Sequence, residues 1–191
     1  SPGNITADNL FRNAFKKHPY GRPIIGSPTT VKSFTQKDFL RFYKRWYSPH
    51  NMAFVVVGDF KTKSMLKKIE RLFSTYKGKK PPARPSDKLC EPRQTSARFS
   101  LQSMSTQSNY FCCGYHVPDI NHADVPAVDV MAHVLGCGDS SRLEQALKQK
   151  QQLAHRIYAY AYTPHDPGLV IIDGTSADKQ TAKLFEGVQT E

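Results

Sequence analysis

The sequence lacks any long apolar run, which argues against a helix that crosses a membrane. Its 191 residues contain no stretch near the ~20 apolar residues that span a bilayer. No leader with a charged start and an apolar centre opens the chain, which begins Ser1-Pro2 without a methionine. We therefore expect a soluble protein with no membrane partner, in the cytoplasm or the periplasm, whose chain has been processed, tagged or cut from a longer one.

Cysteine is scarce, and no Cys-x-x-Cys motif occurs. Cys112 and Cys113 are adjacent, so they would point to opposite faces of a strand and would not share a partner. We expect all four thiols to be free and buried or incidental, which leans towards a reducing compartment. The four are Cys90, Cys112, Cys113 and Cys137.

The usual catalytic and metal-binding motifs are also missing. None of the seven histidines belongs to His-Glu-x-x-His, to its inverted form, or to a helical pair four residues apart. His116 and His122 flank a turn, but such a pair is more often surface chemistry than a zinc site. No Gly-x-Ser-x-Gly motif marks a serine nucleophile. We predict no catalytic residue and no metal ligand in this chain.

Acidic residues are few, with 16 Asp and Glu against 27 Lys and Arg, for a net charge of +11. The excess lies in residues 1–92, which hold 19 basic and 6 acidic residues, whereas residues 93–191 hold 8 and 10. The asymmetry indicates two units with different surfaces. A basic unit could attract nucleic acid, anionic lipid or an acidic protein. Because its lysines and arginines are scattered along helical patterns, we favour a solvated basic face.

Apolar residues are plentiful enough for a core, at 39% of the chain, and their periodicity predicts an α+β fold. Thr6 is the expected cap of the first helix, and Thr35 to Asp38 has the form of a capping box. The last two strands should pair as an antiparallel hairpin, which predicts an antiparallel or mixed sheet with packed helices. Helices are expected at 5–17, 39–47, 62–76, 124–135, 140–148 and 178–187, and strands at 52–60, 97–104, 109–117, 154–162 and 168–174.

A stretch rich in proline and charge, residues 78–92, separates the two predicted units. We expect one unit over residues 1–77 and another over 93–191. The first unit offers only one confident strand, at 52–60. Because a lone strand cannot make a sheet, either the first unit is incomplete or this strand joins a sheet whose other strands are missing from the chain.

Several stretches carry a family resemblance through their order and spacing. His18-Pro-Tyr-Gly-Arg-Pro-Ile-Ile-Gly26 comes first, then Ser48-Pro-His-Asn-Met52 and Val55-Val-Val-Gly-Asp59. Tyr115-His-Val-Pro118 and Val134-Leu-Gly-Cys-Gly-Asp-Ser-Ser-Arg-Leu143 follow the proline-rich stretch. Together they resemble the pitrilysin/insulinase family of zinc peptidases, which includes the mitochondrial processing peptidases. Cys137 and Gln151-Gln152 depart from the family pattern, which has glycines at or near these places.

The resemblance implies that the zinc motif, His-x-x-Glu-His, and a later glutamate ligand lie upstream of His18. Residues 1–77 would be the C-terminal half of the catalytic-type domain, residues 78–92 the linker, and residues 93–191 the N-terminal half of a second, non-catalytic domain. The parent would be a zinc metalloendopeptidase that hydrolyses peptides or unfolded protein segments. Zinc is expected in that parent and not in this fragment, which is predicted to be inactive and to help form the substrate-enclosing chamber.

Three residues are the candidate contacts of the second unit: Gly136, Gly138 and Arg142. The two glycines could offer backbone N–H groups to an anion, or could simply permit a tight turn between helices. Arg142 could donate a bidentate pair to a carboxylate, or could form a structural salt bridge. By resemblance, all three would face a substrate cleft or a contact between domains.

Two other functions stay open. The chain could belong to a catalytically inactive scaffold or partner subunit of the same family, which would form a dimer with a related subunit. Alternatively, the basic first unit could bind nucleic acid, which is the less favoured interpretation. The expected partners are a peptide or unfolded protein substrate and the remainder of the parent chain.

Overall fold

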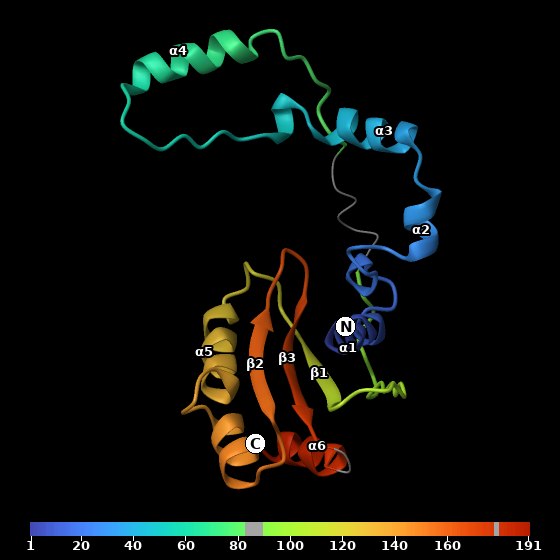
Figure 1. The fold of residues 1–191 in the computed structure, drawn as a ribbon. Helices are drawn as coiled ribbons and strands as arrows, with labels where there is room; N and C mark the ends of the chain where they lie inside the picture. Colours follow the sequence, from blue (N-terminus) through green and yellow to red (C-terminus); the bar gives the residue numbers. More distant parts are fainter. Residues whose placement is uncertain (83–89, 178–179) are drawn as a thin grey trace. The chain divides into compact units, whose positions relative to one another are not determined.

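The computed structural model describes residues 1–82, 90–177 and 180–191. The chain forms two compact units (Figure 1). One combines Ser1–Pro23 with Leu89–Glu191, and the other is Ile24–Lys88. The boundary predicted at 78–92 remains a prediction, and residues 83–89 of that stretch lie outside the described part of the chain.

A three-stranded antiparallel sheet organises the first unit, in the order β1-β3-β2 (Figure 1). The strands are β1 (Asn109–Val117), β2 (Arg156–Tyr162) and β3 (Gly168–Ser176). Strand β3 lies in the centre and is buried along most of its length, as its run of Leu, Val and Ile requires. The predicted hairpin is confirmed, because Tyr162 pairs with Leu169 across the intervening turn.

Helices cover one face of this sheet and make the larger core. They are α5 (Val125–Gly136), the π-helical segment η3 (Glu144–Lys150) and α6 (Thr181–Thr190). The core between them and the sheet is formed by Leu143, Leu147, Ala154, Ile157, Ala159, Ile172, Leu184 and Val188. The helix predicted to start at Asp178 begins at Thr181, and Asp178 itself lies outside the described residues.

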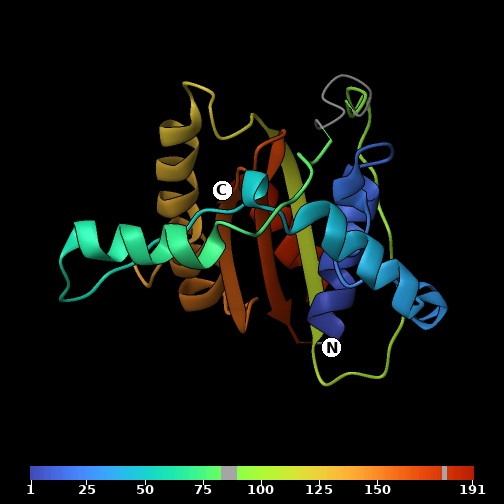
Figure 2. The same cartoon turned by 90° about the horizontal axis from the view of Figure 1, so that it is seen from above.

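Helix α1 (Pro2–Ala14) packs against the opposite face of the sheet, beside β1 (Figure 2). Phe15 and Ala14 bury themselves against Leu169 and Ile171 there. The predicted cap was wrong: Ser1 accepts the amide of Asn4, and Thr6 lies inside the helix with its hydroxyl donating to the Pro2 carbonyl at 3.0 Å. A proline in the first turn favours this earlier start, since that position needs no amide donor.

The unit Ile24–Lys88 contains α2 (Pro28–Ser33), α3 (Gln36–Trp46) and α4 (Thr62–Phe73). The short 3₁₀ turn η2 (Pro49–Asn51) follows α3 in this unit. Another 3₁₀ turn, η1 (Pro19–Gly21), lies before the unit begins. The strand predicted at 52–60 does not form among the described residues, and Val55 and Val57 are 88% and 92% exposed. A strand needs a neighbour for its backbone groups, and the pairing of 52–60 with strands missing from this chain stays a prediction.

The strand predicted at 97–104 was also wrong. That segment is irregular, and Phe99 and Leu101 are 83% and 87% exposed. The sheet starts on this side only at Asn109, where β1 pairs with β3. The alternation of apolar and polar residues at 97–104 is typical of a strand, but none of the three described strands pairs with this segment.

The capping box at the start of α3 is confirmed. Thr35 Oγ1 accepts the amide of Asp38 at 3.3 Å, and Asp38 Oδ2 accepts the amide of Thr35 at 3.0 Å. The hydrogen bonds from Thr35 hold the pKa of Asp38 below its usual value. Two backbone amides at the helix start thus obtain partners from side chains.

Thr35→Ala is expected to accelerate hydrogen exchange at the Asp38 amide about fivefold, since the helix loses its N-cap acceptor. The matched control is Thr29→Ala, at an exposed position in α2. Exchange measured by NMR should change in α3 for the first variant only. Equal exchange rates in the two variants would show that the cap does not hold the first turn of α3.

Candidate functional site

The glycine-rich segment at the end of α5 contains two glycines, and each is needed for a different structural reason. Gly136 is buried at the C-terminal end of the helix, where α5 lies directly on β2. A Cβ at this position would overlap the backbone nitrogen of Ala159 and lie 2.6 Å from the Ala159 Cβ. Gly136 is therefore required by close approach of helix and strand.

Gly138 has a backbone φ of +83°, and a Cβ there would meet nothing within 4 Å. Its carbonyl accepts the amide of Ser141 at 3.1 Å, which closes the turn before the next helix. The geometry fits the tight turn that the sequence left open as an alternative. A substrate contact at these glycines remains a prediction.

Arg142 follows this turn and is paired with the last residue of the chain. Its Nε and Nη2 donate to Glu191 Oε2 at 3.2 and 3.0 Å. The arginine side chain is 57% exposed, so solvent weakens the pair. The structure thus places Gly136, Gly138 and Arg142 in consecutive segments, from the end of α5 through the turn into the next helix.

A second constellation, which sequence reasoning missed, is centred on Glu91. Its carboxylate accepts the backbone amides of Lys16, Lys17 and His18 at 2.8, 2.7 and 2.9 Å. Burial alone would raise the pKa of Glu91, but these three donors and the Arg98 guanidinium outweigh it and hold the pKa below its usual value. We call this arrangement the Glu91 clasp.

Arg98 completes the clasp from the other side. Its Nη1 donates to the carbonyls of Asn13 and Ala14 at 2.6 and 3.1 Å and lies 4.0 Å from Glu91 Oε1. The arginine thus satisfies carbonyls at the C-terminal end of α1, while Glu91 satisfies the amides that follow. Both side chains come from residues more than seventy positions away, so no local pattern marks them.

The segment that starts at His18 is docked on the β2–β3 turn. His18 Nε2 lies 3.6 Å from Asp166 Oδ2, and the Tyr20 hydroxyl donates to the same oxygen at 3.3 Å. Nδ1 of His18 accepts the amide of Tyr20 at 3.2 Å, which fixes the imidazole. Phe15 packs edge-on against the Tyr20 ring. His18 therefore orders a loop, and Pro19–Gly21 forms a 3₁₀ turn there.

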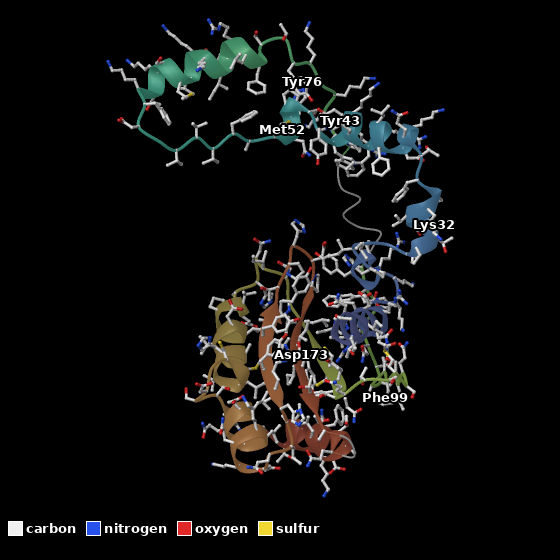
Figure 3. The ribbon with its side chains drawn as sticks, viewed as in Figure 1. Lys32, Tyr43, Met52, Tyr76, Phe99 and Asp173 are labelled. Atoms are coloured by element: carbon white, nitrogen blue, oxygen red, sulfur yellow. The ribbon has the colours of Figure 1, made fainter. Side chains whose placement is uncertain are left out.

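A third group of polar residues lies on the α1 side of the sheet, where Figure 3 labels Asp173. Cys112, Asp173 and Tyr158 are cross-strand neighbours in β1, β3 and β2. Arg156 Nη2 lies 3.2 Å from Asp173 Oδ1, and the rings of Tyr158 and Tyr160 stack with centroids 5.6 Å apart. A hydrogen bond to the Asp173 carboxylate raises the pKa of Tyr158 to about 12.

All four cysteines are free; Cys90 and Cys137 are exposed, whereas Cys112 and Cys113 are half-buried. Burial raises the pKa of Cys112 to about 12 and that of Cys113 to about 11, which makes both weak nucleophiles at neutral pH. Across residues 1–82, 90–177 and 180–191, no three His, Cys, Asp or Glu side chains come together in a way that could hold a metal ion. No described helix is long and apolar enough to cross a membrane.

The family model for the peptidase M16 inactive domain matches residues 33–191. Zinc protease PqqE of Helicobacter pylori is 29% identical over 161 residues, which cover 84% of this chain and 36% of that protein. The uncharacterized zinc protease YmxG of Bacillus subtilis is 26% identical over 189 residues, which cover 99% of this chain and 45% of that protein. The chain therefore spans less than half the length of these relatives.

Solved structures show the same fold. The crystal structure of a protease from Helicobacter pylori superposes with a TM-score of 0.90 at 26% identity, covering 100% of this chain and 46% of that one. A peptidase M16 inactive domain from Pseudomonas fluorescens gives a TM-score of 0.87 at 18% identity, covering 100% of this chain and 45% of that one. The α+β architecture and its antiparallel sheet are those of these proteins.

Proposed function

Because the chain belongs to the peptidase M16 family through its match to the inactive domain, we propose that it is the non-catalytic portion of a zinc metalloendopeptidase. The parent would hydrolyse peptides or unfolded protein segments. This portion would form part of the enclosure around the substrate. The observation that carries the proposal is the match over residues 33–191, and relatives that are named zinc proteases support it.

Zinc would be held by residues outside this chain. The described residues offer no group of three ligands, so they do not fit the metal. In the parent, zinc would supply the Lewis acid that activates water for attack on the peptide bond. This chain's own residues would shape the enclosure and position the substrate.

The unit Ile24–Lys88 exposes apolar side chains that a further segment of the parent chain would cover. Phe39 and Phe42 of α3 are 65% and 60% exposed, and Val55 and Val57 are nearly fully exposed. Apolar side chains gathered on one unit to this extent mark a surface that another segment covers. We propose that the remainder of the parent chain is that segment.

The sequence upstream of Ser1 in the parent tests the peptidase proposal. An intact His-x-x-Glu-His motif, together with one zinc per parent chain by elemental analysis, is the expected result. A motif that lacks a histidine or the glutamate would overturn the peptidase proposal and leave an inactive partner subunit. One tightly bound zinc per chain in the 191-residue chain alone would contradict the placement of the metal upstream.

Arg142 is the proposed contact to an extended peptide. Only its Nε and Nη2 donate hydrogen bonds within the described residues, which leaves Nη1 of this partly exposed side chain for a carbonyl or carboxylate of the substrate. Arg142→Ala in the parent is expected to lower kcat/KM for peptides about tenfold. Lys150→Ala, an exposed basic residue further along the same helix, is the matched control. An unchanged kcat/KM for Arg142→Ala would contradict the contact with substrate and leave the salt bridge to Glu191 as the role of Arg142.

A further inference from the structure

We propose that Asp173, Tyr158 and Tyr160 form a subsite for a basic side chain of a peptide, and that Arg156 of the same chain fills this subsite when no peptide is bound. The inference rests on the proposed function for the peptide nature of the ligand. The site is distinct from the glycine-rich turn and from the Glu91 clasp. Its geometry points to recognition of a guanidinium or ammonium group.

Asp173 is the anchor of this subsite. It is the only acidic residue in β3, and its neighbours on the same face, Leu169 and Ile171, are packed in the core under α1. Its side chain is 19% exposed. A carboxylate costs free energy in such a place unless it is paired. Strand pairing sets Tyr158 directly beside it on β2.

Arg156 shows that the place accepts a guanidinium. Nη2 of Arg156 donates to Asp173 Oδ1 at 3.2 Å, and its Cζ lies 5.2 Å from the centroid of the Tyr158 ring. A charge-assisted hydrogen bond combined with an aromatic face is the usual arrangement for binding a cation. Tyr160 stacks on Tyr158 and extends the aromatic surface.

Arg156 is also able to leave. It is the first residue of β2, and its side chain is 58% exposed. Because solvent reaches the guanidinium end of the pair, Arg156 can exchange its contact with Asp173 for water at little cost. A basic side chain of a peptide would make the same contacts and compete with Arg156 for the carboxylate.

Space for such a ligand lies beside these residues. A cavity of about 400 Å³ lies between the first half of α1 and this face of the sheet, and its lining includes Arg156, Tyr158, Tyr160 and Asp173 together with Asn4 and Thr6 of α1. This volume falls within the range of small-ligand pockets. The α1 side of the cavity also carries the apolar residues Ala7, Leu10 and Phe11, which could contact the aliphatic part of such a side chain.

The test compares two capped pentapeptides, Ala-Ala-Arg-Ala-Ala and its citrulline counterpart, by isothermal titration calorimetry on the 191-residue chain. Citrulline keeps the shape of arginine and removes its charge. The arginine peptide should bind more tightly than the citrulline peptide. Arg156→Ala should bind the arginine peptide about tenfold more tightly than the unaltered chain does, because the competing side chain is gone.

Asp173→Asn should abolish the difference between the two peptides, whereas Asp129→Asn, at an exposed position on α5, should preserve it. Circular dichroism of each variant checks that it is folded, and the peptide comparison on the unaltered chain needs no variant. Equal binding of both peptides, or no gain in Arg156→Ala, would overturn the subsite. Peptidase activity of the parent is measured separately, so an active parent without this preference refutes the subsite alone.

Discussion

Gly136→Ala is expected to lower the free energy of unfolding of the unit that contains the sheet by about 4 kcal/mol. An added Cβ would overlap the Ala159 backbone and lie 2.8 Å from the Tyr158 carbonyl carbon. Both contacts are to the backbone of β2 or to a Cβ fixed on it, so neither can move aside as the end of a flexible side chain would. Relief therefore requires α5 to shift away from the sheet.

The sign of this effect makes the test sharp. In an ordinary helix, glycine to alanine stabilises by up to about 1 kcal/mol, whereas here the same change should destabilise strongly. Gly138→Ala is the matched control, two residues away in open space. It should cost only about 1 kcal/mol, since the price is a side chain at positive φ without a clash. Urea unfolding followed by near-ultraviolet circular dichroism measures both, and similar losses would contradict the close packing of α5 on β2.

Glu91→Gln is expected to lower the free energy of unfolding by about 3 kcal/mol at neutral pH. The side chain is 10% exposed, and its two oxygens accept three backbone amides. Glutamine keeps one oxygen as an acceptor and turns its NH₂ group towards amide donors that need an acceptor. Glu70→Gln, at an exposed position on α4, is the control and should change stability little.

The effect of Glu91→Gln should depend on pH in a defined direction. The pKa of Glu91 is held below its usual value in the folded chain, so its ionised form stabilises the fold above the unfolded pKa of about 4.3. That contribution is lost as the pH falls through the lower, folded pKa. The stability difference between the unaltered chain and the variant should therefore be full at pH 7 and shrink below about pH 4. A difference that stays constant down to pH 2 would show that the charge of Glu91 is not what holds the clasp.

Two local patterns were predicted correctly from the sequence, whereas Thr6 was wrongly predicted as the cap of α1. The hairpin of β2 and β3 followed from alternation and a turn, and the capping box of Thr35 and Asp38 lies within four residues. The expected strands at 52–60 and 97–104 had the right composition but no partner in the described chain. A strand depends on a neighbour that can lie anywhere in the sequence, so composition alone does not decide it.

At the candidate site, too, some features could be predicted from the sequence and others could not. The sequence singled out Gly136 and Gly138 together, and only the structure separates a glycine required by packing from one required by positive φ. Glu91 could not be found from sequence, because the amides it binds are 73 to 75 residues away. The pairing of Tyr158 with Asp173 depends on strand register, which no local pattern decides.

The Glu91 clasp also has a consequence for the topology of the chain. Because Glu91 accepts the amide of His18, the 72 residues between them form a loop whose two ends meet in the unit that contains the sheet. The unit Ile24–Lys88 is thus an insertion within a closed loop, and its host already holds the two ends together. The entropy of such a loop grows only with the logarithm of its length, so doubling it costs about 0.6 kcal/mol. Segments could be added to this unit or removed from it during evolution with little cost to the domain that carries it.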